Sequence, residues 1–178
     1  MPASRKTKSA CRSEKQFLQK IYRLIILFLL FPFSLSAQFR NHTHYDEHEF
    51  AIIPGAVYDL GSKNFAWSLH GHFLTSAGQQ SESISAGISV EYIMGDETHF
   101  TAGPAVSVSP WGRLVLIYSP GITFRNGDEG SDYYFSNHFE VAMEFELFGL
   151  IHIGPSAGFS MSGYDNHAGV GIHFGFEL

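Results

Sequence analysis

Apolar side chains alternate with small or polar ones along most of the chain beyond residue 48, and the alternation is clearest at the end. Five large apolar residues share one parity there: Val170, Ile172, Phe174, Phe176 and Leu178. Glycine, His173 and Glu177 occupy the other parity. A period of two places alternate side chains on opposite faces of a strand, so residues 167–178 are predicted to form one amphipathic strand.

Seven earlier segments repeat this alternation. The predicted strands are 50–60, 65–74, 84–93, 99–109, 113–124, 136–147, 150–160 and 167–178. Turn-forming residues separate them, and most connections are short, the clearest exception being a polar loop at 125–132. Strands joined by short connections, with no helical period among them, predict an all-β fold, an eight-stranded antiparallel up-and-down β-barrel.

The size of the apolar face indicates which way it points. The interior of an eight-stranded barrel is just wide enough to be filled by side chains, and residues as large as Trp67, Phe139 and Phe174 recur too often on the apolar face to fit there. The other face is rich in glycine. We therefore predict that the apolar face meets lipid in a transmembrane β-barrel. A soluble periplasmic lipocalin-like barrel, with the apolar face inward, is the alternative.

Four prolines complicate this assignment. Pro54, Pro104, Pro120 and Pro155 each lie beside a glycine, inside a predicted strand and on its apolar parity. Proline cannot donate a hydrogen bond to a sheet and is normally found at edges or bulges. We therefore expect bulges at these positions, each able to reverse the inward and outward assignment beyond it.

The first part of the chain has the features of an export signal. Residues 1–23 hold seven of the eleven Lys and Arg, and an apolar run at 24–33 precedes small residues at 34–37. This order is typical of a secretory signal peptide, and the run is shorter than the roughly 20 residues of a membrane-spanning helix. We predict cleavage after Ala37 rather than a retained anchor. The predicted divisions are a signal peptide at 1–37, a His-rich segment at 38–48 and a β-barrel at 49–178.

Cleavage would change the charge of the chain. The remaining part keeps four basic residues, Arg40, Lys63, Arg113 and Arg125, against sixteen Asp and Glu, a formal charge of −12, and it keeps all ten His. A chain so poor in Lys and Arg has no electrostatic footprint for nucleic acid. The single cysteine, Cys11, precedes the cleavage point, so the cleaved chain can form no intramolecular disulfide.

Several short motifs support the same architecture. They are Ser36-Ala-Gln38, the His-rich residues 42–48, Pro54-Gly-Ala-Val-Tyr58, Gly103-Pro104, Ser119-Pro-Gly121, Gly154-Pro155 and the closing Gly171-Ile-His-Phe-Gly-Phe176. With them, the chain after the signal resembles the small eight-stranded outer-membrane β-barrels of the OmpA/OmpX kind, and in particular short His-tailed barrels of Bacteroidota. The resemblance implies location in the bacterial outer membrane. It brings no catalytic residues with it.

Two groups of residues are candidate ligands for a divalent cation. His42, His44 and His48 lie in the segment before the first strand, and imidazole suits zinc, copper or nickel. A solvated tail is the alternative for this segment. The predicted interior is the second group, and it holds His and Glu with almost no Lys or Arg: His70, His72, Glu91, His138, Glu140, Glu144, Glu146, His152, His173 and Glu177.

Four of the interior residues are expected at the periplasmic end of neighbouring strands and form the proposed barrel site: Glu144, Glu146, His152 and His173. Ligand histidines must be neutral, so affinity should fall as the pH drops through about 6. A network of His and Glu that only fills the barrel is the alternative, because buried carboxylates need partners.

The sequence thus favours an integral outer-membrane β-barrel in lipid, a monomer with a structural or transport-linked role that handles divalent cations. A surface protein that contacts a partner through the loop from Arg125 to Phe135 is the alternative. A lipid-modifying enzyme is a third class, but no nucleophile motif supports it, and we expect no enzymatic activity.

Overall fold

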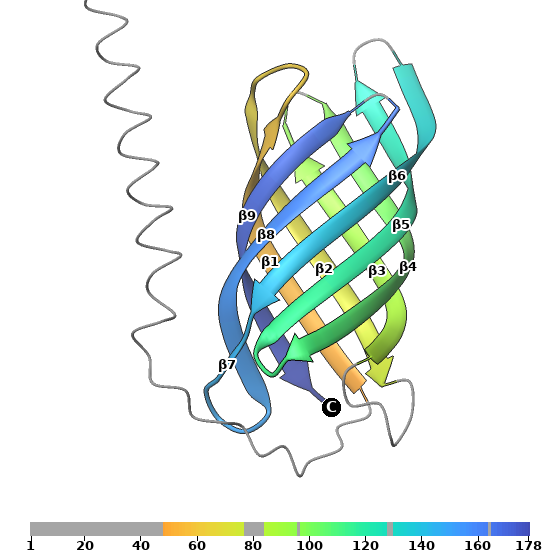
Figure 1. The fold of residues 1–178 in the computed structure, drawn as a ribbon. Coiled ribbons are helices and arrows are strands. Elements are labelled where there is room, and N and C mark those ends of the chain that lie inside the picture. Colours follow the sequence, from red (N-terminus) through yellow and green to blue (C-terminus); the bar gives the residue numbers. More distant parts are fainter. Residues whose placement is uncertain (1–47, 77–83, 96, 128–129, 164) are drawn as a thin grey trace, which may run out of the picture. The chain divides into compact units, whose positions relative to one another are not determined.

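The computed structural model describes residues 48–76, 84–95, 97–127, 130–163 and 165–178, and these form one closed antiparallel β-barrel (Figure 1). The strands are β1 (His48–Asp59), β2 (Phe65–Ser76), β3 (Ile84–Met94), β4 (Thr98–Trp111), β5 (Leu114–Gly127), β6 (Gly130–Met143), β7 (Phe145–Glu146), β8 (Ile151–Ser162) and β9 (Asn166–Glu177). The predicted signal peptide, with His42 and His44, lies outside the described residues.

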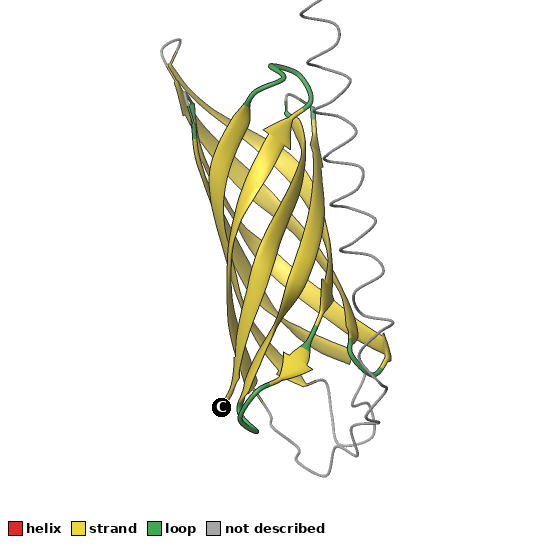
Figure 2. Cartoon of the chain, turned by 90° about the vertical axis from the view of Figure 1, so that its left-hand side faces the viewer, coloured by secondary structure: helices red, strands yellow, loops and turns green. Residues whose placement is uncertain are grey.

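The strands pair in the order of the sequence, and β1 pairs with β9 to close the barrel. Figure 2 shows the resulting barrel of strands from a second side. Segments β6 and β7 both pair with β8, one after the other along its length. They therefore act as one interrupted strand, and the barrel has eight strand positions. The predicted eight-stranded antiparallel barrel is confirmed.

The outer face of the barrel is apolar along each of its long strands. Phe65 and Trp67 are each 70% exposed, and Ile88 and Val170 are exposed by more than half of their surface. A soluble protein would not leave such a continuous apolar surface in water, whereas lipid favours it. A closed ladder also leaves no open edge in the hydrocarbon. The barrel therefore spans a membrane, and the lipocalin-like alternative, which needs the apolar face inside, is wrong.

The inner face is small and polar, as the alternation predicts. Buried serines from five strands line it, together with most of the histidines of the described chain: His70, His72, His99, His138, His152, His167 and His173. Several inward glycines leave no room for a side chain, and a methyl group on Gly103 would overlap the backbone of Pro120 on the neighbouring strand. Glycine therefore lets the strands approach closely across a narrow interior.

The predicted bulges at the four prolines are absent from the described strands. The strand registers are the same on both sides of Pro54, Pro104 and Pro120, and β8 stays in register with β9 through Pro155. A register shift occurs instead in β4, between Val108 and Trp111. The prolines keep the outward parity, so their missing N–H group disturbs the ladder without reversing the faces.

One loop and one strand differ from the sequence prediction. Strand β5 continues to Gly127, and strand β6 begins at Gly130. Most of the predicted loop from Arg125 to Phe135 is therefore paired strand, with Arg125 opposite Asp132. The predicted strand 136–147 is interrupted at Glu144. The interruption lies beside Gly154, since a methyl group there would overlap the carbonyl oxygen of Met143.

Among the described residues, no helix is long and apolar enough to cross a membrane.

Candidate metal centre

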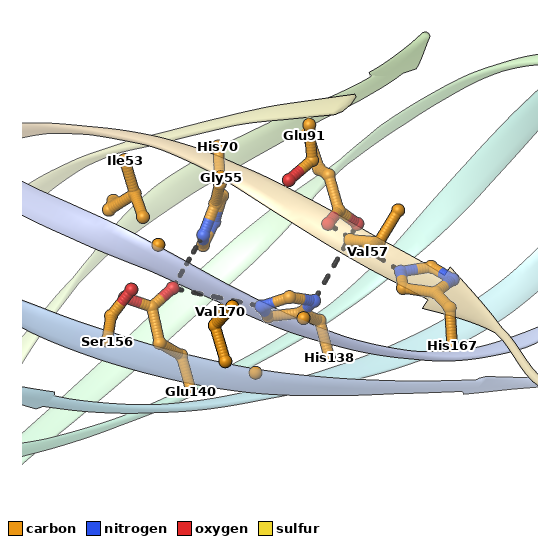
Figure 3. Close-up of a pocket in the computed structure, with 14 residues that line it drawn as sticks. Ile53, Gly55, Val57, His70, Glu91, His138, Glu140, Ser156, His167 and Val170 are labelled. Carbon is orange, nitrogen blue, oxygen red and sulfur yellow. Dashed lines mark hydrogen bonds and ion pairs between the residues drawn. The ribbon is translucent and has the colours of Figure 1, made fainter. Parts of the chain in front are cut away.

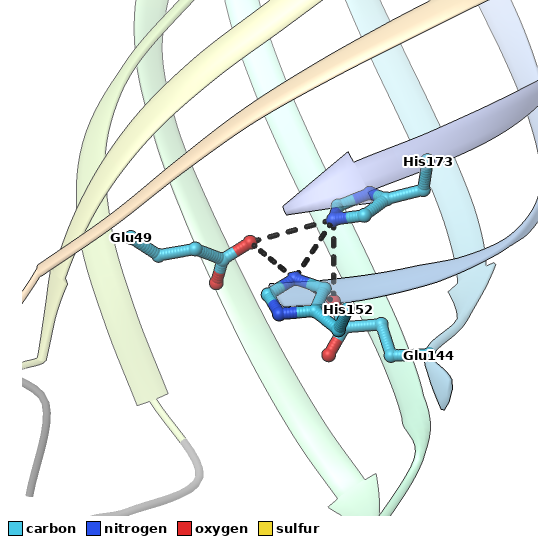
Figure 4. A group of neighbouring side chains, drawn as sticks. All are labelled: Glu49, Glu144, His152 and His173. Carbon is cyan, nitrogen blue, oxygen red and sulfur yellow. Dashed lines mark hydrogen bonds and ion pairs between the residues drawn. The ribbon is translucent and has the colours of Figure 1, made fainter. Parts of the chain in front are cut away.

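Four side chains from both ends of the described chain meet inside the barrel, near the C-terminus (Figure 4). Glu49 comes from β1, Glu144 from the interruption between β6 and β7, His152 from β8 and His173 from β9. We call them the C-terminal cluster. The registers explain the meeting, because β1 and β8 both pair with β9 and their inward residues share one face.

The four candidate ligand atoms of the C-terminal cluster lie close together, with the two histidine nitrogens at similar distances from both carboxylates. His152 Nε2 lies 3.2 Å from His173 Nε2 and 3.4 Å from Glu49 Oε1. Both His152 Nε2 and His173 Nε2 lie 3.5 Å from Glu144 Oε1, and His173 Nε2 lies 3.5 Å from Glu49 Oε1. Ligand atoms held about 2.0–2.1 Å from a tetrahedral zinc ion are about 3.3 Å apart. The cluster therefore has the size of a four-coordinate metal site.

The second ring nitrogen of each histidine faces another carboxylate. His152 Nδ1 is 3.9 Å from Glu177 Oε1, and His173 Nδ1 is 3.9 Å from Glu140 Oε1. Metal-binding histidines commonly have a carboxylate on the nitrogen that does not bind the metal, because it orients the ring. Both rings of the cluster have a carboxylate on that side, at a distance longer than a hydrogen bond.

Gly175 makes room for His152. The two residues are paired across β8 and β9, so their side chains would lie on the same inner face. A methyl group on Gly175 would overlap Nε2, Cε1 and Cδ2 of the His152 ring. The position of the ligand nitrogen thus depends on a glycine that contributes no ligand itself.

A series of carboxylates and imidazoles continues from this cluster through the barrel. Glu140 Oε2 accepts a hydrogen bond of 2.7 Å from His70 Nδ1 and lies 3.8 Å from His138 Nε2. His138 Nδ1 is 3.6 Å from Glu91 Oε2, and His167 Nε2 is 3.6 Å from Glu91 Oε1. The inner face therefore carries alternating acids and histidines from one end of the barrel toward the other.

The series ends at the mouth formed by the β8–β9 connection. Asp165 Oδ2 lies 2.8 Å from His99 Nδ1 and 3.5 Å from His167 Nδ1. Burial opposes the charged form of Asp165, but the two imidazoles outweigh burial and hold the pKa of this carboxyl below its ordinary value. Asp165 is therefore ionised at neutral pH, and it gives the mouth an anionic group.

The structure brings some of the predicted ligands together and places others elsewhere. Glu144, His152 and His173 meet in the C-terminal cluster, as their strand positions predicted. Glu146 is exposed and lies outside the cluster. His48 begins β1, where its Nδ1 is 3.1 Å from Thr75 Oγ1 and its ring stacks on Phe73.

Sequence reasoning missed several functional candidates. Glu49 was assigned to the start of the barrel without a role, although it has the same parity as the inward residues of the first strand. His99, His167 and Asp165 were also left out of the interior, yet all three join the series of acids and histidines. The parity of the first strand could have identified Glu49, whereas Asp165 lies in a connection where parity gives no signal.

Comparison with known proteins supports the fold. The chain matches no protein-family model and no curated protein. Among solved structures it is similar to Neisserial surface protein A, with a TM-score of 0.52 at 2% identity over 74% of this chain and 96% of that one. It is also similar to a de novo designed transmembrane β-barrel, with a TM-score of 0.50 at 8% identity over 74% and 98% of the two chains. At such identities the likeness concerns the fold.

The closed eight-stranded ladder, the apolar outer face and the polar interior are together the architecture of outer-membrane barrels. The chain is an integral membrane β-barrel protein with the fold of the small outer-membrane barrels.

Proposed function

We propose that this barrel binds a divalent transition-metal cation at the C-terminal cluster and has a transport-linked or structural role in the outer membrane. The observation that carries the proposal is the spacing of four candidate ligand atoms, each from a different part of the barrel wall: both histidine nitrogens lie 3.2–3.5 Å from each other and from both carboxylate oxygens. Such convergence of two imidazoles and two carboxylates is costly without a positive charge at its centre.

The ligand set indicates the class of metal. Imidazole and carboxylate together suit zinc, copper and nickel, and a tetrahedral arrangement favours zinc among them. Two carboxylates also balance the two charges of the cation. The described part of the chain carries ten Asp and Glu against three Lys and Arg, so a bound cation would supply charge that the chain itself lacks.

The test is calorimetric titration of the barrel in detergent with zinc, copper and nickel, after removal of metal by a chelator. We expect binding tighter than roughly 100 μM, about −5.5 kcal/mol, and a strong loss of affinity in the variant with His152→Ala and His173→Ala. Affinity should also fall as the pH is lowered, because protons compete with the metal for imidazole.

Controls separate this site from the His-rich segment and from misfolding. A variant with His42→Ala and His44→Ala removes the candidate ligands before the barrel and should keep the interior site. Heat-modifiable migration on a gel reports whether each variant is a closed barrel. Equal affinity in the parent and in the folded variant without His152 and His173 would refute the proposal.

A further inference from the structure

Three other residues converge farther along the barrel, and none of them belongs to the C-terminal cluster (Figure 3). Glu91 comes from β3, His138 from β6 and His167 from β9, and all three are buried. Each offers one ligand atom, and the three atoms lie within 4.8 Å of one another. We call them the mid-barrel cluster.

The imidazoles of the mid-barrel cluster are not satisfied by the protein. Neither ring nitrogen of His138 nor either one of His167 has a hydrogen-bond partner among the described residues, although the nitrogens are inaccessible. Buried polar atoms almost always have a partner, and leaving one without it costs free energy. Two of these nitrogens, His138 Nδ1 and His167 Nε2, face Glu91 at 3.6 Å without a hydrogen bond, so a cation held between the three residues would give them the contact that they lack.

There is room for that ligand. A cavity of about 30 Å³ is lined by Glu91, His138 and His167 together with small residues such as Gly158 and Gly169. A cavity of this size holds one or two water molecules, and hence a metal ion with one water as its fourth ligand. Structural zinc sites are closed by four protein ligands, so a site with three protein ligands and an open position is of a different kind.

The surroundings support each histidine in the same way as in the C-terminal cluster. His138 Nε2 is 3.8 Å from Glu140 Oε2, and His167 Nδ1 is 3.5 Å from Asp165 Oδ2. The nitrogens that face Glu91 are the other two, His138 Nδ1 and His167 Nε2. Each ring thus has a carboxylate behind it and one nitrogen directed toward the shared acid.

The mid-barrel cluster is also next to an entrance. His167 lines a second cavity, of about 710 Å³, at the mouth of the barrel, and Asp59, Glu97 and Asp165 contribute carboxyl groups to its wall. The wall also carries Arg125, which pairs with Glu97, so three carboxyl groups stand against one guanidinium. A wall of net negative charge raises the local concentration of cations. Of the mid-barrel cluster, His167 lines this cavity and Glu91 and His138 do not, so a cation that enters the mouth meets His167 before the other two.

We propose that Glu91, His138 and His167 form a second binding site for a divalent transition-metal cation, with one position open to water and access from the β8–β9 mouth. The inference deepens the proposed function, but the two sites share no ligand. Glu140 lies between them, within 3.9 Å of both His173 and His138, so the barrel holds two cation sites in series.

The experiment measures the number of zinc ions bound per barrel. The parent for this test carries His42→Ala and His44→Ala, so that the segment before the barrel does not contribute. The closed barrel in detergent is loaded with zinc, freed of excess by gel filtration, and assayed for zinc and protein. We expect two ions per barrel. A variant with His138→Ala and His167→Ala should keep one, and the variant without His152 and His173 should also keep one.

Two further variants guard against loss of the fold. Glu91→Gln removes the shared carboxylate with little change of shape and should also reduce the count to one. Ser89→Ala changes a buried inward residue two positions away on β3 and should keep the count at two.

The outcomes separate the two ideas. A count of one in the parent that falls to zero without His152 and His173 overturns the second site and leaves the first. A count of one that falls to zero without His138 and His167 overturns the first and leaves the second. A count unaffected by removing His138 and His167 from a closed barrel refutes the inference.

Discussion

Gly175→Ala should weaken metal binding at the C-terminal cluster without removing any ligand. The added methyl group would overlap the His152 ring at three atoms, including the ligand nitrogen Nε2. The ring must then turn away from Glu49, Glu144 and His173. Loss of a group that merely orients a ligand costs about 10–100-fold in metal affinity, and we expect at least this, about 1.4–2.8 kcal/mol.

The assay is the calorimetric titration with zinc, and a matched substitution serves as the control. Gly71→Ala also adds one methyl group to a strand, but its nearest neighbour would be the Ala51 carbonyl oxygen at 3.4 Å, an ordinary contact. It should leave the affinity unchanged. If Gly175→Ala forms a closed barrel and binds zinc as tightly as the parent does, His152 is not a ligand, and the geometric argument fails.

Two further predictions concern the lipid face and the mouth. Val141→Arg, on the outer face of β6, should destabilise the barrel by about 2–4 kcal/mol in unfolding experiments in lipid, whereas Ser131→Arg near the end of the same strand should cost about 0–1 kcal/mol; equal costs would contradict the assignment of the faces. Because the folded-state pKa of Asp165 is lowered, its ionised form stabilises the barrel above the unfolded pKa of about 3.9, and this contribution is lost as the pH falls. Asp165→Asn should therefore lower the free energy of unfolding at pH 7 and make a smaller difference below pH 4, and a difference independent of pH would refute the role of its ion pairs.

Much of the fold could be predicted from the sequence because one physical rule governs it. A strand with a lipid face and a narrow interior must alternate, and the alternation in 167–178 defines β9 almost to the residue. The predicted bulges are wrong because the rule that confines proline to edge strands and bulges describes sheets whose inner strands are fully hydrogen-bonded. Here Pro54 and Pro155 remain in register, and the adjoining glycines lie on the inner face where the strands approach closely.

The site was harder to predict, because its members meet through the register between strands and the closure of the barrel. The alternation predicted that His152 and His173 point inward. It could not predict that Glu49 lies beside them, since that contact depends on the pairing of the first and last strands. Glu146 has the correct parity, but it lies beyond the interruption at Glu144, in the short strand β7, and it is exposed. The narrower resemblance to short His-tailed barrels stays a prediction.

The pairing of β1 with β9 has a consequence for assembly. These strands come from opposite ends of the described chain, so their contact must form across a long intervening segment, which slows folding. The C-terminal cluster lies across the contact between β1 and β9, with Glu49 on β1 and His173 on β9. A cation held there would bind the closed barrel and not the open sheet, and by mass action its stabilisation of the closed state would grow with the logarithm of its concentration above the dissociation constant. Metal availability would then influence how much of the newly made chain reaches the closed state.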